Sequence, residues 1–327
     1  MAGLIAGFDA GQTHTTCRLA RAQPGLAGRI DWEVVAEGRG PGVSHLAASG
    51  GPQRFQAALI QSLGNARAIL TPGDWGDGSL PLRAAAIGAS GIEQGSGVQT
   101  QGQALACSAL NLPLERVVVT GDERTALVGA FADEAGIVVI SGTGTIAVGR
   151  NANGQEHRCA GWGWLLDGGG SAMDIGQDGL RLSLQMADGR RPEGPLRAAL
   201  WQGLGLEPNR AQAAQGLKAL VVAPEFGPAG FARLAPLVAS LASAGDADAL
   251  AILRRNAEVL AAMAAAVAAA LDLAAPAVCP MGGALEHLPA FRTAFQAALT
   301  AALPGCRCTE AAGDACAGAL AMAKELL

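Results

Sequence analysis

Two short turns in the sequence carry the residue types that bind phosphate. The first spans Asp9 to Thr15 (DAGQTHT), and the second spans Ser141 to Thr145 (SGTGT). Glycine lets the backbone approach a ligand closely, and threonine adds a hydroxyl group to the backbone N–H donors. We therefore expect both turns to hold phosphate oxygens. An ordinary hairpin turn uses the same residue types, so that neither turn decides the chemistry alone.

Two aspartates follow apolar runs and could act on a phosphate. Asp9 lies at the end of the run that begins at Leu4, where a carboxylate could hold Mg²⁺ through water, because this ion prefers hard oxygens and keeps much of its hydration. Asp122 follows Val117 to Val119. A single carboxylate suffices to take a proton from an alcohol during phosphoryl transfer. Asp122 could equally be the N-cap of a helix that starts at Glu123, and the two roles are compatible.

Other nucleotide and nucleophile motifs fit less well. Gly142-x-Gly144-x-x-Ala147 loosely resembles a dinucleotide fingerprint, but that motif requires a helix to begin in the glycines. Here Thr145 to Val148 are β-favouring residues that continue as a strand. The sequence has no GxxxxGK[ST] segment, and no histidine neighbours Asp122, so neither a P-loop nor a catalytic triad is supported.

A glycine-rich segment from Ala160 to Gly176 contains two of the five tryptophans, Trp162 and Trp164. Aromatic faces next to carboxylates suit sugars, whereas tryptophan can also pack a joint between domains. Both interpretations stay open at this point.

Composition narrows the class of protein. The chain has 327 residues, of which 50% are hydrophobic and 16% charged, and its net charge is −5. We expect a soluble protein with two domains and no nucleic-acid partner. Seven cysteines without a CxxC pair, and no basic, apolar export signal, favour the cytoplasm. Val259 to Leu271 is too short to cross a membrane and predicts a buried helix. The four histidines show no zinc-binding spacing.

The apolar periodicity predicts strands and helices in alternation, which indicates an α/β fold. Strands are expected at Leu4–Asp9, His14–Leu19, Asp31–Glu37, Arg83–Gly88, from Val117, on both sides of 142–144, and at Ala277–Pro280. Helices are expected at Pro52–Leu70, Thr100–Leu110, up to Phe131, Ser171–Ala187, Pro195–Leu204, Ala211–Ala219, Gly230–Ala242, Ala247–Leu271, Gly282–Phe295 and Asp314–Leu327, with a loop at Thr71–Ser79. Each half begins with a strand, a turn of small residues and a second strand, which predicts two related domains.

Together these motifs resemble the BadF/BadG/BcrA/BcrD-type ATPase family of the sugar kinase, Hsp70 and actin superfamily, and in particular its N-acetylglucosamine kinase branch. The resemblance extends over nearly the whole chain, because the family's motifs occur in the same order. The residues that carry it are the two turns, Asp122, the Gly161-Trp162-Gly163 element, the glycine pair Gly282-Gly283, and the segment Phe231 to Leu250.

This resemblance implies two ribonuclease H-like (actin-like ATPase) domains around a nucleotide cleft, with boundaries at 1–121 plus 313–327 and at 122–312. It implies an ATP- and Mg²⁺-dependent kinase that phosphorylates an amino sugar, with Asp122 as general base and the 6-hydroxyl as acceptor; a homodimer is also compatible with it. The implied ATP-binding residues are Gly11, Gln12, Thr13, Gly142, Thr143, Gly144, Gly282 and Gly283. The implied sugar-binding residues are Ser44, His45, Asp122, Thr145, Gly161, Trp162 and Asp167, and Asp9 is the implied Mg²⁺ residue.

Three positions depart from the family's pattern. The usual GDEGS is here DGGGS, so Gly168 replaces a sugar-binding carboxylate that Asp167 could replace from one position earlier. Ser44 stands where an asparagine contacts the amino sugar, and Ile146 stands where some members have asparagine. Glucosamine or another hexose therefore remains open. Two alternatives also remain: an ATPase that activates a dehydratase through an iron–sulfur cluster, and a sugar sensor without turnover.

Overall fold

The computed structural model describes residues 3–24, 30–70, 81–209 and 212–327. The chain divides into two compact units, Met1–Glu134 with Ala311–Leu327, and Ala135–Glu310. We describe each unit by itself. The expected loop at Thr71–Ser79 and the expected helix start at Ala211 lie outside the described residues.

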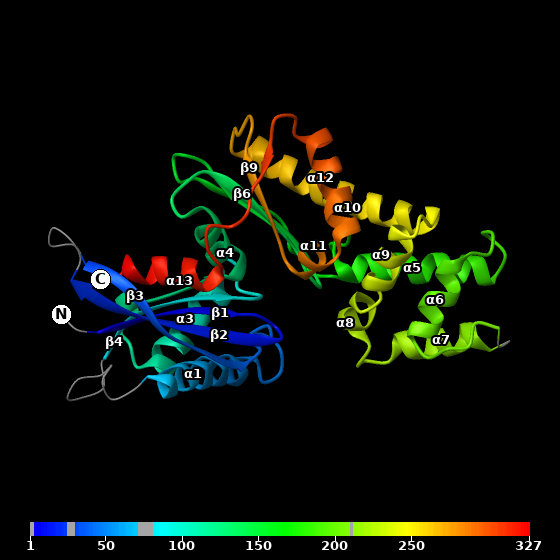
Figure 1. Ribbon diagram of the computed structural model, residues 1–327. Helices are drawn as coiled ribbons and strands as arrows, with labels where there is room; N and C mark the ends of the chain where they lie inside the picture. Colours follow the sequence, from blue (N-terminus) through cyan, green and yellow to red (C-terminus); the bar gives the residue numbers. More distant parts are fainter. Residues whose placement is uncertain (1–2, 25–29, 71–80, 210–211) are drawn as a thin grey trace. The chain divides into compact units, whose positions relative to one another are not determined.

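The first unit contains a five-stranded sheet with the order β3-β2-β1-β4-β5 (Figure 1). Strands β1, β2 and β3 form an antiparallel meander, whereas β4 pairs with β1 and β5 pairs with β4 in parallel. The bounds are β1 Leu4–Ala10, β2 His14–Pro24, β3 Ile30–Pro41, β4 Leu82–Ala89 and β5 Val117–Gly121. The central strands β1 and β4 are almost entirely buried, as expected for strands that are covered on both faces.

Helices cover both faces of this sheet. In Figure 1, α1 (Gly51–Ile69) and α13 (Ala315–Lys324) lie on opposite sides of it. Helix α1 and its neighbour α3 (Gly97–Leu110) pack on one face around Phe8, Phe55 and Leu59. Helix α13 packs on the other face against alanines of β4, and α4 (Asp122–Phe131) lies beside α13. The short 3₁₀ helix η2 (Leu114–Arg116) precedes β5.

The second unit repeats the topology of the first sheet. Its order is β10-β9-β6-β7-β8, in which β6, β7 and β8 form an antiparallel meander and β9 and β10 are added in parallel. The bounds are β6 Gly136–Ser141, β7 Thr145–Arg150, β8 Glu156–Ala160, β9 Ala277–Met281 and β10 Arg307–Cys308. Strands β1 and β6 therefore hold equivalent positions, and the two glycine-containing turns follow them. The internal repeat predicted from the sequence is present in the fold.

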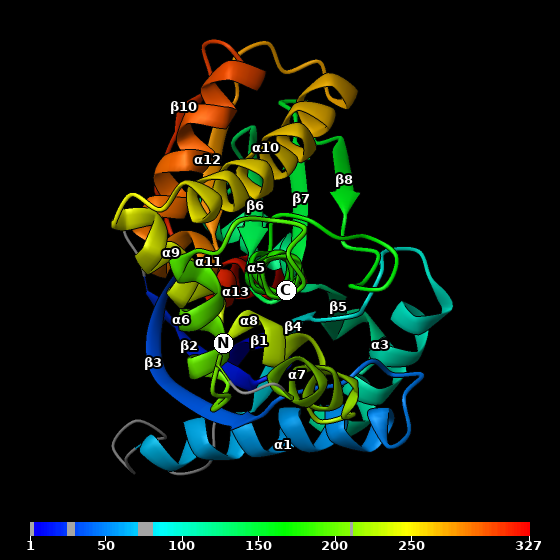
Figure 2. The same ribbon diagram turned by 90° about the vertical axis from the view of Figure 1, so that its right-hand side faces the viewer.

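The helices of the second unit build its core. Figure 2 shows α10 (Ala247–Ala270) along β7, with α12 (Pro289–Ala302) next to α10. The remaining helices are α5 Ala172–Ala187, α6 Pro195–Gly203, α7 Ala213–Val222, α8 Gly227–Ala232, α9 Ala235–Ser243 and α11 Gly283–His287. Asp246 caps α10 by accepting a hydrogen bond from the Ala249 N–H group, and the alanine-rich face of α10 is buried, as predicted.

No single helix within the described residues is long and apolar enough to cross a membrane. The stretch Gly227–Ser243 and the helix Ala247–Ala270 meet that criterion only as a pair that is bent by 119°. Both members of this pair contribute buried residues to the core of the second unit.

Several predicted elements differ from the structure. The expected helix at Gly230–Ala242 is two helices, since Pro236 lacks an N–H group and its ring would collide with the carbonyl of Ala232, where α8 ends. Pro289 likewise starts α12 and separates it from α11. The strands β8 and β10 were not predicted. The observed division between the units follows Glu134 rather than Gly121, because α4 packs on α13 and β4.

Candidate active site

The carboxyl edge of the first sheet brings two aspartates to neighbouring strand ends. Strands β1, β4 and β5 run in parallel, with Asp9 aligned to Gly88 and Gly88 aligned to Thr120. Asp9 lies one residue before the end of β1, and Asp122 follows the last residue of β5. Since the carboxyl ends of parallel strands meet at one edge, both carboxylates belong to the same edge, with β4 between them.

Helix α4 begins at Asp122, and glycines allow it to pack closely against α13. A Cβ atom on Gly318 would collide with the carbonyl of Thr125, and one on Gly129 would collide with the carbonyl of Asp314. Helices α4 and α13 can cross this closely only because these positions lack side chains. Gly121 occupies the N-cap position of α4, so Asp122 is the first residue of the helix and not its cap.

The surroundings of Asp122 favour its protonated form. Burial is the largest cause, followed by the negative charges of Glu123 and Asp9, and together they raise the pKa of Asp122 to about 7. Backbone N–H groups at the start of α4 oppose this shift. The pKa of Asp9 is also raised, by burial and by Asp314, while His14 lowers it. A carboxylate with a pKa near neutrality can exchange a proton under physiological conditions.

The first turn is held by backbone hydrogen bonds. The Gly11 N–H group donates to the His14 carbonyl over 3.1 Å, and the Gly11 carbonyl accepts from the Val43 N–H group over 2.9 Å. A Cβ atom on Gly42 would collide with the carbonyl of Gln12, so Gly42 allows the following loop to lie against the turn. Gly11, Gln12 and Thr13 therefore form one surface with that loop.

The loop after Gly42 carries the two expected sugar contacts of this unit. The Ser44 hydroxyl is buried and has no hydrogen-bond partner among the described residues. The exposed His45 side chain accepts a hydrogen bond from the Ala47 N–H group over 3.1 Å. A buried hydroxyl without a partner costs free energy unless a water or a ligand pairs with it. The structure thus brings Ser44 and His45 to the side of the first turn.

The second turn is joined to the glycine-rich segment by three hydrogen bonds. The Ser141 hydroxyl donates to the Gly170 carbonyl over 2.6 Å, and the Thr145 hydroxyl donates to the Gly169 carbonyl over 3.3 Å. The Ala172 N–H group donates to the Gly142 carbonyl over 2.9 Å. The hydroxyls of Ser141 and Thr145 therefore position the neighbouring loop in this structure.

The outer side of the second turn is left open. A Cβ atom on Gly142 or Gly144 would meet no described atom within 4 Å, and Thr143 between them is exposed. These three residues are the part of the turn that remains accessible to a phosphate.

The glycine pair after β9 lies next to this turn. Strands β6 and β9 are parallel neighbours, with Ile140 aligned to Met281. Gly282 has a φ of 92°, and a Cβ atom on it would lie 2.6 Å from the Ser141 carbonyl oxygen. Only glycine satisfies both conditions. Gly282 and Gly283 are thus placed at the same strand edge as the second turn.

The Gly161–Asp167 segment presents an aromatic ring to solvent. Trp162 is 65% exposed, and the Arg158 guanidinium lies over its ring, 5.0 Å from the centroid. The backbone N–H group of Trp162 donates to the Asp167 carboxylate over 3.3 Å, and the Arg158 guanidinium donates to the Gly161 carbonyl over 2.7 Å. Asp167 therefore contacts the tryptophan element directly, whereas Gly168 carries no carboxylate.

Comparison with known proteins agrees with this arrangement. A model of the BadF/BadG/BcrA/BcrD ATPase family matches residues 82–315. The chain belongs to this family. The resemblance stated from the sequence motifs is therefore confirmed.

Two further similarities concern proteins whose names describe them as sugar kinases. The chain is 40% identical over 75 residues to an N-acetylmuramic acid/N-acetylglucosamine kinase of Clostridium acetobutylicum, which is 23% of this chain and 24% of that protein. The matches to curated relatives thus span about a quarter of their length. A solved structure from Chromobacterium violaceum, described as a proposed N-acetylglucosamine kinase, is 28% identical with a TM-score of 0.72, and covers 98% of this chain and 99% of that chain.

The fold extends to more distant sugar kinases. A ROK family glucokinase from Streptomyces griseus, solved with glucose and AMPPNP, has 18% identity and a TM-score of 0.55 and covers 99% of both chains. The prediction of an α/β protein with two ribonuclease H-like (actin-like ATPase) units is confirmed.

One residue of this BadF/BadG/BcrA/BcrD family member was not expected at the site. Asn256 on α10 is buried, and its carboxamide oxygen accepts from the Gly170 N–H group over 2.8 Å. Its NH₂ group donates to Asp178 over 2.9 Å. The Gly169–Gly170 segment is therefore held by Asn256 as well as by the second turn. A single asparagine within an alanine-rich helix is the only sequence signal that could have marked it.

Proposed function

We propose that this protein is an ATP-dependent sugar kinase that phosphorylates an amino sugar, N-acetylglucosamine or glucosamine, at its 6-hydroxyl. One observation carries the proposal: Asp122, with a pKa of about 7, lies at the same sheet edge as the first phosphate turn. The names of the relatives from Clostridium acetobutylicum and Chromobacterium violaceum support the choice of an amino sugar.

In the proposed reaction, Asp122 accepts the proton of the sugar hydroxyl while the hydroxyl oxygen attacks the γ-phosphorus of ATP and ADP leaves. Because Asp122 is partly desolvated and faces negative neighbours, its conjugate acid is stable enough to hold that proton. Ser44 and His45 would orient the sugar on the first unit, and Gly161, Trp162, Asp167 and Thr145 on the second.

The phosphates of ATP would be held by the two turns. Gly11, Gln12 and Thr13 form the first set of donors, and Gly142, Thr143 and Gly144 form the second. Gly282 and Gly283 would contact the adenosine. Preorganised donors of this kind stabilise the charge that develops on the transferred phosphoryl group.

The residues present suit Mg²⁺ bound mainly by water and phosphate. Asp9 offers a hard oxygen ligand, and since burial raises its pKa, a nearby cation would favour its charged form. The described residues contain no group of three or more His, Cys, Asp or Glu side chains that could enclose a metal by themselves. Mg²⁺ would neutralise phosphate charge, and Asp9 would orient its water ligands. No observation favours the alternative with an iron–sulfur cluster.

A panel of sugars tested with ATP and Mg²⁺, with ADP release as the readout, tests this proposal. N-acetylglucosamine or glucosamine should stimulate ADP release, and the 6-deoxy analogue of the active sugar should not. No stimulation by any hexose or amino sugar would contradict the kinase proposal and favour a sensor without turnover. Stimulation by the 6-deoxy analogue would move the acceptor to another hydroxyl. The same proposal includes a cytoplasmic location, which cell fractionation would test. It also includes a homodimer, which analytical sedimentation would test.

A further inference from the structure

A basic cavity lies between α5 and α10, apart from the two turns. Its volume is about 400 Å³, and it lies wholly within the second unit. Nine residues line it: Asp178, Arg181, Leu182, Gln185, Arg191, Asp248, Ala251, Ile252 and Arg255. None of them was assigned a role in ATP or sugar binding above.

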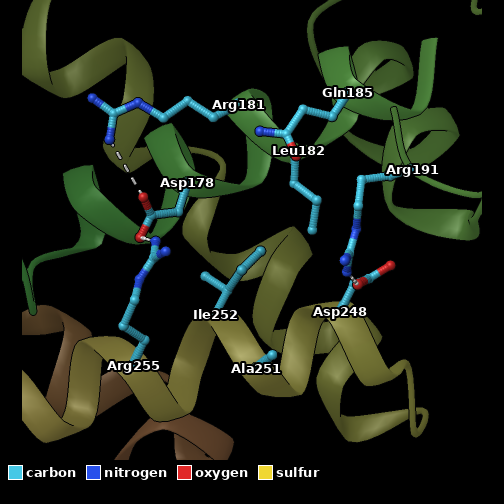
Figure 3. A pocket seen from close by; sticks show the side chains of 9 residues that line it. All are labelled: Asp178, Arg181, Leu182, Gln185, Arg191, Asp248, Ala251, Ile252 and Arg255. Carbon is cyan, nitrogen blue, oxygen red and sulfur yellow. Dashed lines mark hydrogen bonds and ion pairs between the residues drawn. The ribbon is translucent and has the colours of Figure 1, made fainter. Parts of the chain in front are cut away.

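The charges of this cavity leave a surplus of guanidinium groups. Figure 3 shows Asp178 between Arg181 and Arg255, with Arg191 next to Asp248. Three arginines thus face two carboxylates in a chain whose net charge is −5. An excess of positive charge in a concave site favours an anion.

The arginines can rearrange, whereas Asp178 cannot. The side chains of Arg181 and Arg255 are 65% and 62% exposed, and that of Asp178 is 11% exposed. Arg191 contacts Asp248 over 2.9 Å and is 49% exposed. Arg191 and Asp248 are both partly exposed, and exposed ion pairs are weak, so a stronger anionic partner can compete for this guanidinium group. Arg181 and Arg255 are open to solvent although Asp178 is not, so their guanidinium groups are accessible to an anion in the cavity. Each guanidinium offers five donors, and phosphate accepts them in pairs.

The floor of the cavity is apolar. Leu182, Ala251 and Ile252 lie between the Asp178 and Asp248 ends, as Figure 3 shows. A ligand that fits this pattern has a phosphate group for the arginines and a short carbon body for the floor. We propose that the cavity binds the phosphate group of a small organic phosphate. This inference does not depend on the proposed kinase activity.

Binding of a phosphate in this cavity would affect the glycine-rich segment, because Asp178 connects the two. Asp178 forms an ion pair with Arg255 and accepts a hydrogen bond from the Asn256 NH₂ group, and Asn256 in turn accepts from the Gly170 N–H group. Asp178, Arg181 and Arg255 also line a second cavity of about 440 Å³ whose wall includes the 164–166 and 168–169 parts of that segment. A phosphate that draws the arginines away from Asp178 therefore changes contacts that hold the segment. Indole fluorescence from this segment should report the binding.

Isothermal titration calorimetry on the full chain, saturated with Mg²⁺ and AMPPNP so that triphosphate sites are filled, tests the proposal. Glycerol 3-phosphate and inorganic phosphate are the two probes. Tighter binding of glycerol 3-phosphate identifies an organic phosphate as the ligand, and equal binding identifies free phosphate.

Three variants determine where the probe binds. Arg255→Gln removes a charge-assisted donor and should weaken binding about tenfold. The neighbouring Arg254→Gln changes the same charge on the same helix outside the cavity and should leave the affinity unchanged. Asp178→Asn keeps an acceptor for Asn256 but removes the competing carboxylate, so it should tighten binding.

Arg255→Gln should weaken probe binding and Asp178→Asn should tighten it, whereas a general loss of structure would weaken binding in both variants. Circular dichroism melting of each variant verifies that it is folded. Equal affinity in Arg255→Gln and the unchanged protein, or the same loss in Arg254→Gln as in Arg255→Gln, would overturn the proposal. Weaker binding in Asp178→Asn would also overturn it, since the carboxylate would then not compete with the anion. Absence of measurable binding at millimolar probe would do the same.

Discussion

Asp9 and Asp122 lie at the carboxyl ends of β1 and β5, and the charge of Asp9 helps to raise the pKa of Asp122. Burial contributes more to this shift, and Glu123 contributes as well. The sheet topology produces the relationship, because β4 is inserted between the two strands and aligns their ends. A carboxylate whose charged form is disfavoured becomes a stronger proton acceptor.

The first prediction concerns the pH dependence of sugar-stimulated ADP release. Asp122 must be deprotonated to act as a base, so kcat/KM should rise with pH and level off above the pKa of about 7. Initial rates at limiting sugar, measured across neutrality with constant ionic strength, give this profile. A rate that is already maximal in mildly acidic buffer would show that Asp122 has an ordinary pKa or is not the base.

The second prediction concerns stability. Because the pKa of Asp122 is raised on folding, the unfolded state loses this proton at a lower pH than the folded state does, so the free energy of unfolding falls as the pH rises from the usual pKa range of an aspartate to about 7 and stays constant above it. Asp122→Asn removes that charge and should raise the free energy of unfolding by about 1–2 kcal/mol in alkaline buffer. This gain in the free energy of unfolding should disappear as the pH falls below the usual pKa range of an aspartate. Urea unfolding at an acidic and an alkaline pH measures both values, and an equal or reversed difference in alkaline buffer contradicts the assignment.

The third prediction concerns Gly282. Its φ of 92° and its contact with the Ser141 backbone both exclude a side chain, so Gly282→Ala should lower the thermal unfolding midpoint and weaken ATP binding. Gly245→Ala is the matched control, because Gly245 has a φ of 90° but no described atom within 4 Å of a Cβ position. Gly282→Ala should cost about 1–3 kcal/mol more than the control does. Equal losses would mean that backbone strain alone explains the effect.

The fourth prediction concerns Asn256. Asn256→Ala leaves the Gly170 N–H group without its acceptor and deprives Asp178 of a donor, so the cost should be about 1–3 kcal/mol. Because Asn256 acts through the glycine-rich segment, the KM for sugar should rise more than the KM for ATP. Thr300 is exposed, and Thr300→Ala removes a hydrogen bond within α12 only, so this control should change neither KM value. A proportional rise in both KM values would indicate a general structural role.

Much of the fold followed from local patterns in the sequence. The repeat was identified because an apolar run, a turn of small and hydroxyl-bearing residues and a second run follow one another in each half. The two sheets indeed share one topology. The strands β8 and β10 were missed for opposite reasons: β8 has the polar sequence EHRCA, and β10 has only two residues. Both are outermost strands that form by pairing with a neighbour, so their own residues carry little signal.

The site was only partly predictable for the same physical reason. Glycines such as Gly282 could be identified from motifs, because a position where two backbone segments approach closely accepts no side chain. The roles of Ser141 and Asn256 depend on which carbonyl or amide lies opposite in space, and Gly170 is distant from Asn256 in the sequence. The roles assigned to the individual ATP- and sugar-binding residues stay predictions.

The most direct measurement of the central claim compares Asp122→Asn with the unchanged protein in a single-turnover assay. Both proteins are loaded with ATP, Mg²⁺ and the active sugar, and sugar phosphate and bound nucleotide are quantified. We predict that the variant binds ATP with unchanged affinity and forms sugar phosphate about 100- to 10,000-fold more slowly, since a general base contributes about 10²–10⁴-fold to the rate. Sugar phosphate formed at the same rate by both proteins would contradict the account and place the base elsewhere.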